Sequence, residues 1–273
     1  MLRLLRIEWL KYRHFKLFWI IYFLYLLFLV IFTSSGVFVL DFFDQKGINF
    51  GELKPSLIPI YDFPDIWQNI TYFAGFFQFI MAFIVIIFIT NEFSYRTIRQ
   101  NVIDGLSKSQ FLTAKISFIF LLCLINTIVL SINGLILGLI YSSVTEFRFI
   151  IEGVEFLFAF GLALFAYSLF AFFVGMLFKR SGVSIILFAI YSLFAEPFIT
   201  VILQNHSGVS GFYARLSDFF PMEAINNLIQ NPLPRYILRE IQNYISGGEL
   251  AIVIGYVIVF IWASFYLLKK RDF

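Results

Sequence analysis

Residues 91–115 read NEFSYRTIRQNVIDGLSKSQFLTAK and form a polar, basic segment between two long apolar runs. If this segment is helical from about Phe93, Ile98 and Val102 lie along one side and Arg99 points elsewhere. A helix of this kind is expected to lie on a membrane surface rather than to cross the membrane. A solvated loop with ordinary positive charges is the alternative interpretation of the same residues.

The apolar runs around this segment are long enough to cross a bilayer. Residues 17–40 contain no charge and would extend about 36 Å as a helix. The chain is 60% hydrophobic and 14% charged, against about 25% charged residues in an ordinary soluble domain. We therefore predict an all-α integral membrane protein, with residues 1–273 forming a single transmembrane domain. The six expected spans are residues 17–40, 71–90, 116–141, 154–178, 183–203 and 251–268.

The connections between the spans differ in character. Residues 1–16 form a basic amphipathic segment, which predicts an interfacial helix at the inner membrane surface. Residues 41–70 contain five acids and three prolines and are expected to form an irregular loop. Residues 204–248 are the least regular part, where we expect short interfacial or re-entrant helices on the outer side.

The distribution of basic residues predicts the orientation in the membrane. With six spans, one set of connections and ends carries 14 Lys and Arg, and the other set carries 6. Because Lys and Arg are enriched on the cytoplasmic side, both termini and residues 91–115 are predicted to be cytoplasmic.

The sequence gives little support for an enzyme. One Cys and two His exclude a disulfide framework and a cysteine-built or histidine-built metal site. No G-x-x-x-x-G-K-[ST] loop is present to bind ATP. We expect no catalytic, cofactor-binding or metal-binding residue in this chain, and we expect its surroundings to be lipid rather than nucleic acid.

Polar groups inside the spans are the candidates for a substrate path, because burying them in lipid is costly. Gln78 lies in the second span, and Asn126 and Asn133 share one face of the third. Hydrogen bonds between helices are the alternative role for these amides. Glu196, next to Pro197, is either a substrate or proton group, or a carboxylate that reaches outer-leaflet water where Pro197 interrupts the fifth span.

Small residues four positions apart predict close helix packing. Gly134 and Gly138 have this spacing in the third span, and Ala171 and Gly175 have it in the fourth.

The order of these features resembles the membrane (permease) subunits of type-2 ABC exporters. The resemblance covers essentially the whole chain, from the amphipathic first helix to the irregular region before span six. A family pattern of acidic, Thr, Gly, Ser, Phe and Lys residues is matched here by Glu92, Thr97, Gly105, Ser107, Phe111 and Lys115. Many members have Pro where this chain has Leu106, which is typical of a divergent bacterial branch.

This resemblance implies a permease of the bacterial cytoplasmic (inner) membrane that is not itself an ATPase. It implies that two copies of this chain, or this chain and a related permease, form the pore with two ABC ATPase subunits, which bind ATP and Mg²⁺. The segment from Glu92 to Gly105 would be the coupling helix, seated in a groove of the ATPase, and Glu92 would pair with Arg96. The residues expected to couple to the ATPase are Glu92, Arg96, Thr97, Arg99, Gly105, Ser107 and Lys115. The resemblance does not identify the transported substrate.

Two alternatives from other classes are an ion-coupled secondary transporter that uses Glu196 and a membrane scaffold that does not transport. The first usually has inverted repeats, and we identify none in the sequence.

Overall fold

The computed structural model describes most of the chain, and its described part contains helices and no strand. The described residues are 2–13, 15–47, 58–95, 97, 100, 105–205, 216–238 and 244–270.

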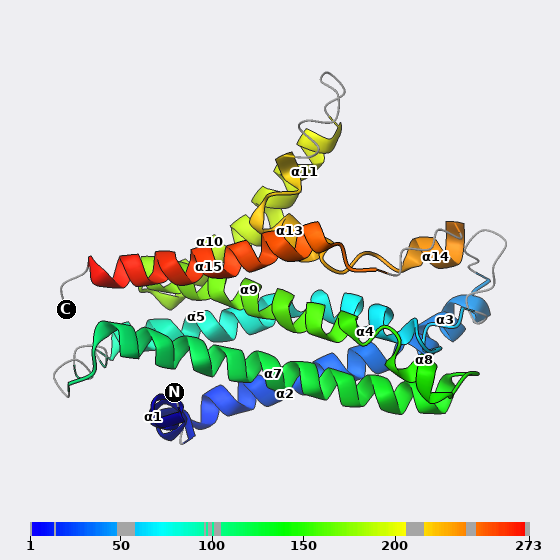
Figure 1. The fold of residues 1–273 in the computed structure, drawn as a ribbon, viewed down its shortest axis with the longest axis horizontal. Coiled ribbons are helices and arrows are strands. Elements are labelled where there is room, and N and C mark those ends of the chain that lie inside the picture. The colour runs from blue at the N-terminus through cyan, green and yellow to red at the C-terminus, as the bar shows by residue number, and fades with distance from the viewer. Residues whose placement is uncertain are drawn as a thin grey trace.

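Long helices lie side by side in the bundle of Figure 1. The helix α9 is central, because it packs against α5, α7 and α15, while α2 packs against α5 and α7. These helices are apolar on nearly all sides, as expected of helices that face other helices or lipid rather than water. Their bounds are Lys16–Ser34 for α2, Gln78–Ser94 for α5, Lys108–Tyr141 for α7, Glu155–Phe178 for α9 and Gly247–Lys269 for α15.

Within the described residues, five helices are long and apolar enough to cross a membrane, or up to six if one bent pair forms a single span. This agrees with the predicted all-α membrane protein. The boundaries of several spans differ from those expected.

The region predicted as the second span, residues 71–90, is formed by two helices, and the first of them begins before residue 71. It consists of α4 (Ile66–Gly75) and α5, which meet at 49° across a short break. The polar start of α4 hid this extension in the sequence, because Gln68 and Asn69 look unsuited to a buried helix. Both are buried and paired: Gln68 donates to the Gln230 carbonyl at 3.0 Å, and Asn69 donates to the Ile60 carbonyl at 2.7 Å.

The first span ends sooner than expected, and a separate short helix follows it. α2 stops at Ser34, and a second helix, α3 (Gly36–Gln45), starts after Ser35. The Tyr61 hydroxyl accepts a hydrogen bond from the Gly36 N–H at 3.0 Å and donates to the Thr33 carbonyl at 2.5 Å, which secures this junction. The expected irregular loop at 41–70 is therefore wrong at both ends, since α3 and α4 occupy them.

The third span starts eight residues before the predicted position, at Lys108. Ser107 caps this helix: its Oγ accepts from the Gln110 N–H at 3.1 Å, and the Gln110 side chain accepts from the Ser107 N–H at 3.0 Å. Such a reciprocal capping box stabilises a helix start, so α7 continues beyond its apolar part.

The fifth span is not interrupted at Glu196 and Pro197. It continues from α10 (Ser181–Ala189) through a π-helical turn, η2 (Ile190–Ala195), into α11 (Glu196–Asn205). The π-turn directly precedes Pro197, which lacks the N–H that a regular helix would use there. Figure 1 shows α11 leading away from the bundle axis.

The predicted close packing at small residues is confirmed for three glycines. A Cβ on Gly134 or Gly138 of α7 would overlap Ile70 or Phe63, and one on Gly175 of α9 would overlap Ile89. Gly134 and Gly175 let α4 and α5 approach α7 and α9 closely, and Gly138 makes room for the Phe63 ring before α4.

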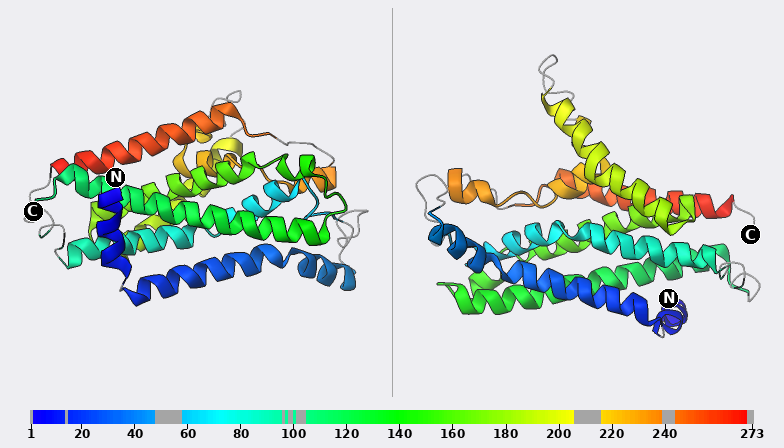
Figure 2. Two further views of the ribbon diagram at one scale, coloured as in Figure 1. Left: turned by 60° about the horizontal axis from the view of Figure 1, so that its bottom comes forward. Right: turned by 180° about the vertical axis from the view of Figure 1, so that it is seen from behind.

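Short helices complete the fold. α13 and α14 lie in the region where short helices were expected, and α8 precedes α9. At the end of the bundle that holds both termini, α1 crosses the long helices and packs against α7 (Figure 2). The bounds are Leu2–Arg13 for α1, Phe147–Ile151 for α8, Pro221–Asn227 for α13 and Leu233–Leu238 for α14.

Candidate functional site

A buried ionic cluster joins α1, the end of α5 and the start of α7. We define it by its five members: Glu8, Lys11, Tyr12, Glu92 and Lys115. Lys115 is fully buried, and its ammonium donates to the Glu8 carboxylate at 2.6 Å and to the Glu92 carboxylate. Three segments that are distant in sequence thus meet at one ammonium group.

The charges of the cluster balance. Two carboxylates face the buried Lys115 and the partly exposed Lys11, which lies 3.4 Å from Glu8 and 3.7 Å from Glu92. Burying a charge costs several kcal/mol unless partners compensate it, and removing one partner of a buried pair typically costs about 3–5 kcal/mol. The arrangement is therefore favourable only while all three segments stay together.

Aromatic rings cover the Lys115 ammonium group. The Lys115 ammonium lies 4.3 Å from the ring centre of Phe88 and 5.5 Å from that of Phe111, distances at which ring and cation attract. The Tyr12 hydroxyl donates to the Phe88 carbonyl at 3.1 Å and to Glu92 at 3.4 Å. Burial, and then the charges of Glu92 and Glu8, raise the pKa of Tyr12, so its phenol stays protonated as a donor.

The cluster also holds the polar segment that follows α5. The Thr97 hydroxyl donates to the Glu92 carboxylate and also to the Glu92 carbonyl, at 3.2 Å for the latter. At the other end, Gly105 has a φ of +90°, a conformation that favours glycine, and Ser107 caps α7. Both ends of the segment are thus attached to the bundle by specific contacts.

A cleft of about 390 Å³ opens beside the cluster, between α1 and the start of the polar segment. It is lined by Lys11, Tyr12, Phe15, Asn91, Glu92, Tyr95, Thr97 and Gln100. Tyr95 at its rim is 73% exposed, so an aromatic side chain is open to a partner there.

The structure brings together part of the expected coupling set. Glu92, Thr97 and Lys115 meet in or beside the cluster, and Gly105 and Ser107 form the turn into α7. Arg96 and Arg99, together with the expected pairing of Glu92 with Arg96, lie outside the described residues. The described partners of Glu92 are Lys115, Lys11, Tyr12 and Thr97.

The sequence interpretation missed Glu8. It is the one acid in the basic first helix, and it lies one helical turn before Tyr12. A single acid on a basic amphipathic helix that faces the bundle is the signal that points to an ion pair with a later span.

Asn126 and Asn133 join helices rather than line a path. Asn126 donates to the Tyr22 hydroxyl at 3.2 Å, and Asn133 donates to the Thr33 hydroxyl at 2.9 Å. Both residues are buried, and both contacts join α7 to α2. Of the two roles considered, the geometry supports interhelical hydrogen bonding.

Glu196 does not reach water. It is 2% exposed and accepts backbone N–H bonds from Met222 at 2.6 Å and Glu223 at 2.9 Å. These are donors in the first turn of α13, which has no hydrogen-bonding side-chain cap from its own N-cap residue, Phe220. Glu196 therefore attaches α13 to the fifth span.

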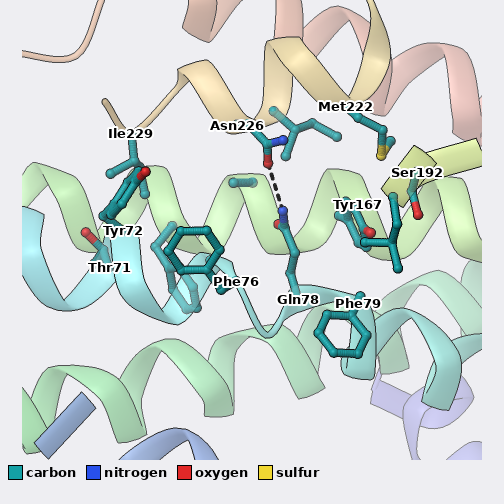
Figure 3. Close-up of a pocket in the computed structure, with 15 residues that line it drawn as sticks. Thr71, Tyr72, Phe76, Gln78, Phe79, Tyr167, Ser192, Met222, Asn226 and Ile229 are labelled. Atoms are coloured by element: carbon teal, nitrogen blue, oxygen red, sulfur yellow. Dashed lines mark hydrogen bonds between the residues drawn. The ribbon is translucent and has the colours of Figure 1, made fainter. Parts of the chain in front are cut away.

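Gln78 is the member of the expected substrate path that lines a cavity. It stands at the break between α4 and α5, and its amide donates to Asn226 of α13 at 3.0 Å (Figure 3). The cavity has a volume of about 260 Å³.

Comparison with known proteins identifies the family. The family described as ABC-2 family transporter protein matches residues 4–195, from α1 to the π-turn of the fifth span, and so includes the whole ionic cluster. Among curated proteins, none matches the chain. The match covers more than half of the chain and agrees with its apolar helical bundle. The chain therefore belongs to the ABC-2 transporter family, as a membrane permease subunit of an ABC transporter.

Proposed function

We propose that this chain is the permease of an ATP-driven exporter and that the ionic cluster transmits force from a separate ATPase. The observation that carries the proposal is the contact of Lys115 with both Glu8 and Glu92. It fixes the two ends of a polar connection, and the surface helix α1, to one point of the bundle.

A connection held in this way transmits displacement instead of absorbing it. When an ATPase pushes the segment between Glu92 and Gly105, the motion passes to α5 and α7 because their ends share buried ion pairs. Packed helices respond to such a push as rigid bodies that tilt or shift. The neighbouring cleft, with Tyr95 exposed at its rim, offers a surface for the ATPase.

In the proposed assembly, two ATPase subunits bind ATP and Mg²⁺, and a second permease, identical or related, completes the pore. Both termini and the polar connection are placed in the cytoplasm of a bacterial cell, beneath the inner membrane. The asymmetry of 14 against 6 basic residues supports this orientation, as does the position of both chain ends at one end of the bundle (Figure 1).

The proposal is tested by purifying the protein from its native membrane and identifying bound proteins by mass spectrometry. We expect an ABC ATPase to copurify with the natural chain and to be lost from the double variant Arg96→Glu/Arg99→Glu. The matched control is Lys46→Glu/Arg148→Glu, which reverses two exposed charges at the opposite end of the bundle. It should retain the ATPase.

A preparation without an ATPase, or equal loss from both double variants, would overturn the proposed coupling. Export direction is tested separately in inverted membrane vesicles, where ATP added outside should drive uptake of the substrate into the vesicle.

A further inference from the structure

The cavity at the break in the second span is built by residues from five segments. α4 and α5 form one wall, α9 and η2 form another, and α13 covers it (Figure 3). Its volume of about 260 Å³ is close to the lower end of small-molecule sites, which measure about 300–1,000 Å³. The cavity is therefore large enough to hold a small molecule or one part of a larger one.

The residues that line the cavity disfavour a charged ligand. None of the described residues that line the cavity is Asp, Glu, Lys or Arg. A charged group placed there would lose its hydration without gaining a counter-ion, which is strongly unfavourable. The bound part of any ligand is therefore uncharged.

The walls also favour apolar and aromatic groups. Five aromatic rings face the cavity, and Phe76 is 54% exposed, which leaves a large ring uncovered at the site. The five are Tyr72, Phe76, Phe79, Phe160 and Tyr167.

The polar feature that decides the ligand class is the pair of amides, Gln78 and Asn226. One hydrogen bond joins them, from Gln78 Nε2 to Asn226 Oδ1. This leaves the Gln78 carbonyl oxygen as an acceptor and the Asn226 amino group as a donor. Exchanging oxygen and nitrogen in both side chains reverses the bond but still leaves one acceptor and one donor.

Two hydroxyls in the wall already donate to backbone carbonyls of the preceding helical turn. The Thr71 hydroxyl donates to the Trp67 carbonyl at 2.6 Å, and the Ser192 hydroxyl donates to the Phe188 carbonyl at 2.8 Å. The amide pair thus offers a neighbouring donor and acceptor in an uncharged, aromatic surrounding. A secondary amide, with its own N–H and C=O, is the complementary group.

We propose that this cavity binds an apolar peptide through one backbone amide, flanked by aliphatic or aromatic side chains, and that this peptide is the transported substrate. The second half of this statement rests on the proposed exporter function. The binding itself does not.

The test uses the full chain, with any subunit that copurifies, in lipid nanodiscs. The probe is radiolabelled N-isobutyl-3-phenylpropanamide, which has a single secondary amide between an aromatic and an aliphatic group, and the comparison ligand is the ester isobutyl 3-phenylpropanoate. Binding to protein-free nanodiscs is subtracted. Since the ester lacks the N–H donor, we expect it to bind about three- to tenfold more weakly, as for the loss of one uncharged hydrogen bond.

Three variants locate the binding. Gln78→Leu/Asn226→Leu should bind amide and ester equally, whereas Asn227→Leu, on the same helix but outside the lining, should keep the preference. Gly75→Leu should abolish saturable binding of both ligands, because Gly75 lines the cavity and a Cβ there meets nothing within 4 Å. The first carbon of the new side chain therefore enters open space, and the rest of the leucine competes with the ligand for the cavity.

Equal binding of amide and ester by the natural chain, a preference that survives the double variant, or no saturable binding would each overturn the proposal. Saturable, amide-dependent binding in a preparation without an ATPase would support the proposed binding site and contradict the proposed exporter function. Copurification of an ATPase without saturable peptide binding would support the proposed exporter function and contradict the proposed binding site.

Discussion

Lys115 and Glu8 are 107 residues apart in the chain, and their side chains meet at 2.6 Å in a fully buried contact. This ion pair joins α1 to the start of α7. Glu92 binds the same ammonium from the end of α5. The first prediction follows from this balance of charges.

Lys115→Met should lower the melting temperature strongly, because two carboxylates then stay buried without their main counter-charge. The expected cost is about 3–5 kcal/mol, the usual effect of removing one partner of a buried ion pair. Thermal unfolding of the detergent-solubilised protein, followed by tryptophan fluorescence, measures it.

The triple variant Glu8→Gln/Glu92→Gln/Lys115→Met should recover much of this loss, since no unpaired charge is left inside. If the triple variant is less stable than Lys115→Met, buried charge is not the cause of the destabilisation.

Glu92→Ala should reduce ATP-driven transport while the ATPase stays bound. The carboxylate is buried and holds Lys115 and Thr97, so its removal loosens the connection while the exposed Tyr95 at the rim of the cleft stays in place. ATPase copurification and transport are measured on the same preparation. Glu152→Ala, which removes an exposed acid at the opposite end, is the control and should transport normally. Full transport by Glu92→Ala would contradict the coupling role.

Gly138→Val should destabilise the fold by about 1–3 kcal/mol, the usual cost of an overfilled contact. Its Cβ would overlap the Phe63 ring, which must move. The matched control is Gly255→Val in α15, where a Cβ meets nothing within 4 Å. A similar fall in melting temperature for both variants would show that the glycine backbone, and not the close approach, is responsible.

Glu196→Leu should lower stability by about 1 kcal/mol, the typical contribution of a helix cap, because α13 then loses the acceptor for two backbone N–H groups. Glu196→Gln keeps an acceptor oxygen and should stay close to the natural protein in both melting temperature and ATP-driven transport. Complete loss of transport in Glu196→Gln, with normal stability, would instead assign the carboxyl group a role in moving protons.

The positions of the spans could largely be predicted, because long uncharged runs cannot be placed in water as helices. The ends of the spans could not. Ser107 and Gln110 start α7 inside a region that looked like a loop, and Gln68 and Asn69 find partners in the distant residues around α14. Hydropathy reflects the free-energy cost of placing a side chain in lipid, and it does not account for hydrogen-bond partners elsewhere in the chain.

Only part of the candidate site could be predicted from the sequence. Glu92, Thr97 and Lys115 follow a local pattern that the family resemblance identifies, whereas Glu8 depends on how α1 packs against α7. The roles of Asn126, Asn133 and Glu196 also depend on tertiary hydrogen bonds. A polar residue in a span indicates that a partner exists, but it does not identify the partner.

The ionic cluster also imposes an order on biosynthesis. Glu8 leaves the ribosome 107 residues before Lys115, about 5–20 s earlier at a synthesis rate of roughly 5–20 residues per second. Until then, Glu8 and Glu92 have no Lys115 to bind, so these contacts cannot yet hold α1 against α7. The first helix made is thus fixed to the bundle only when the third span arrives.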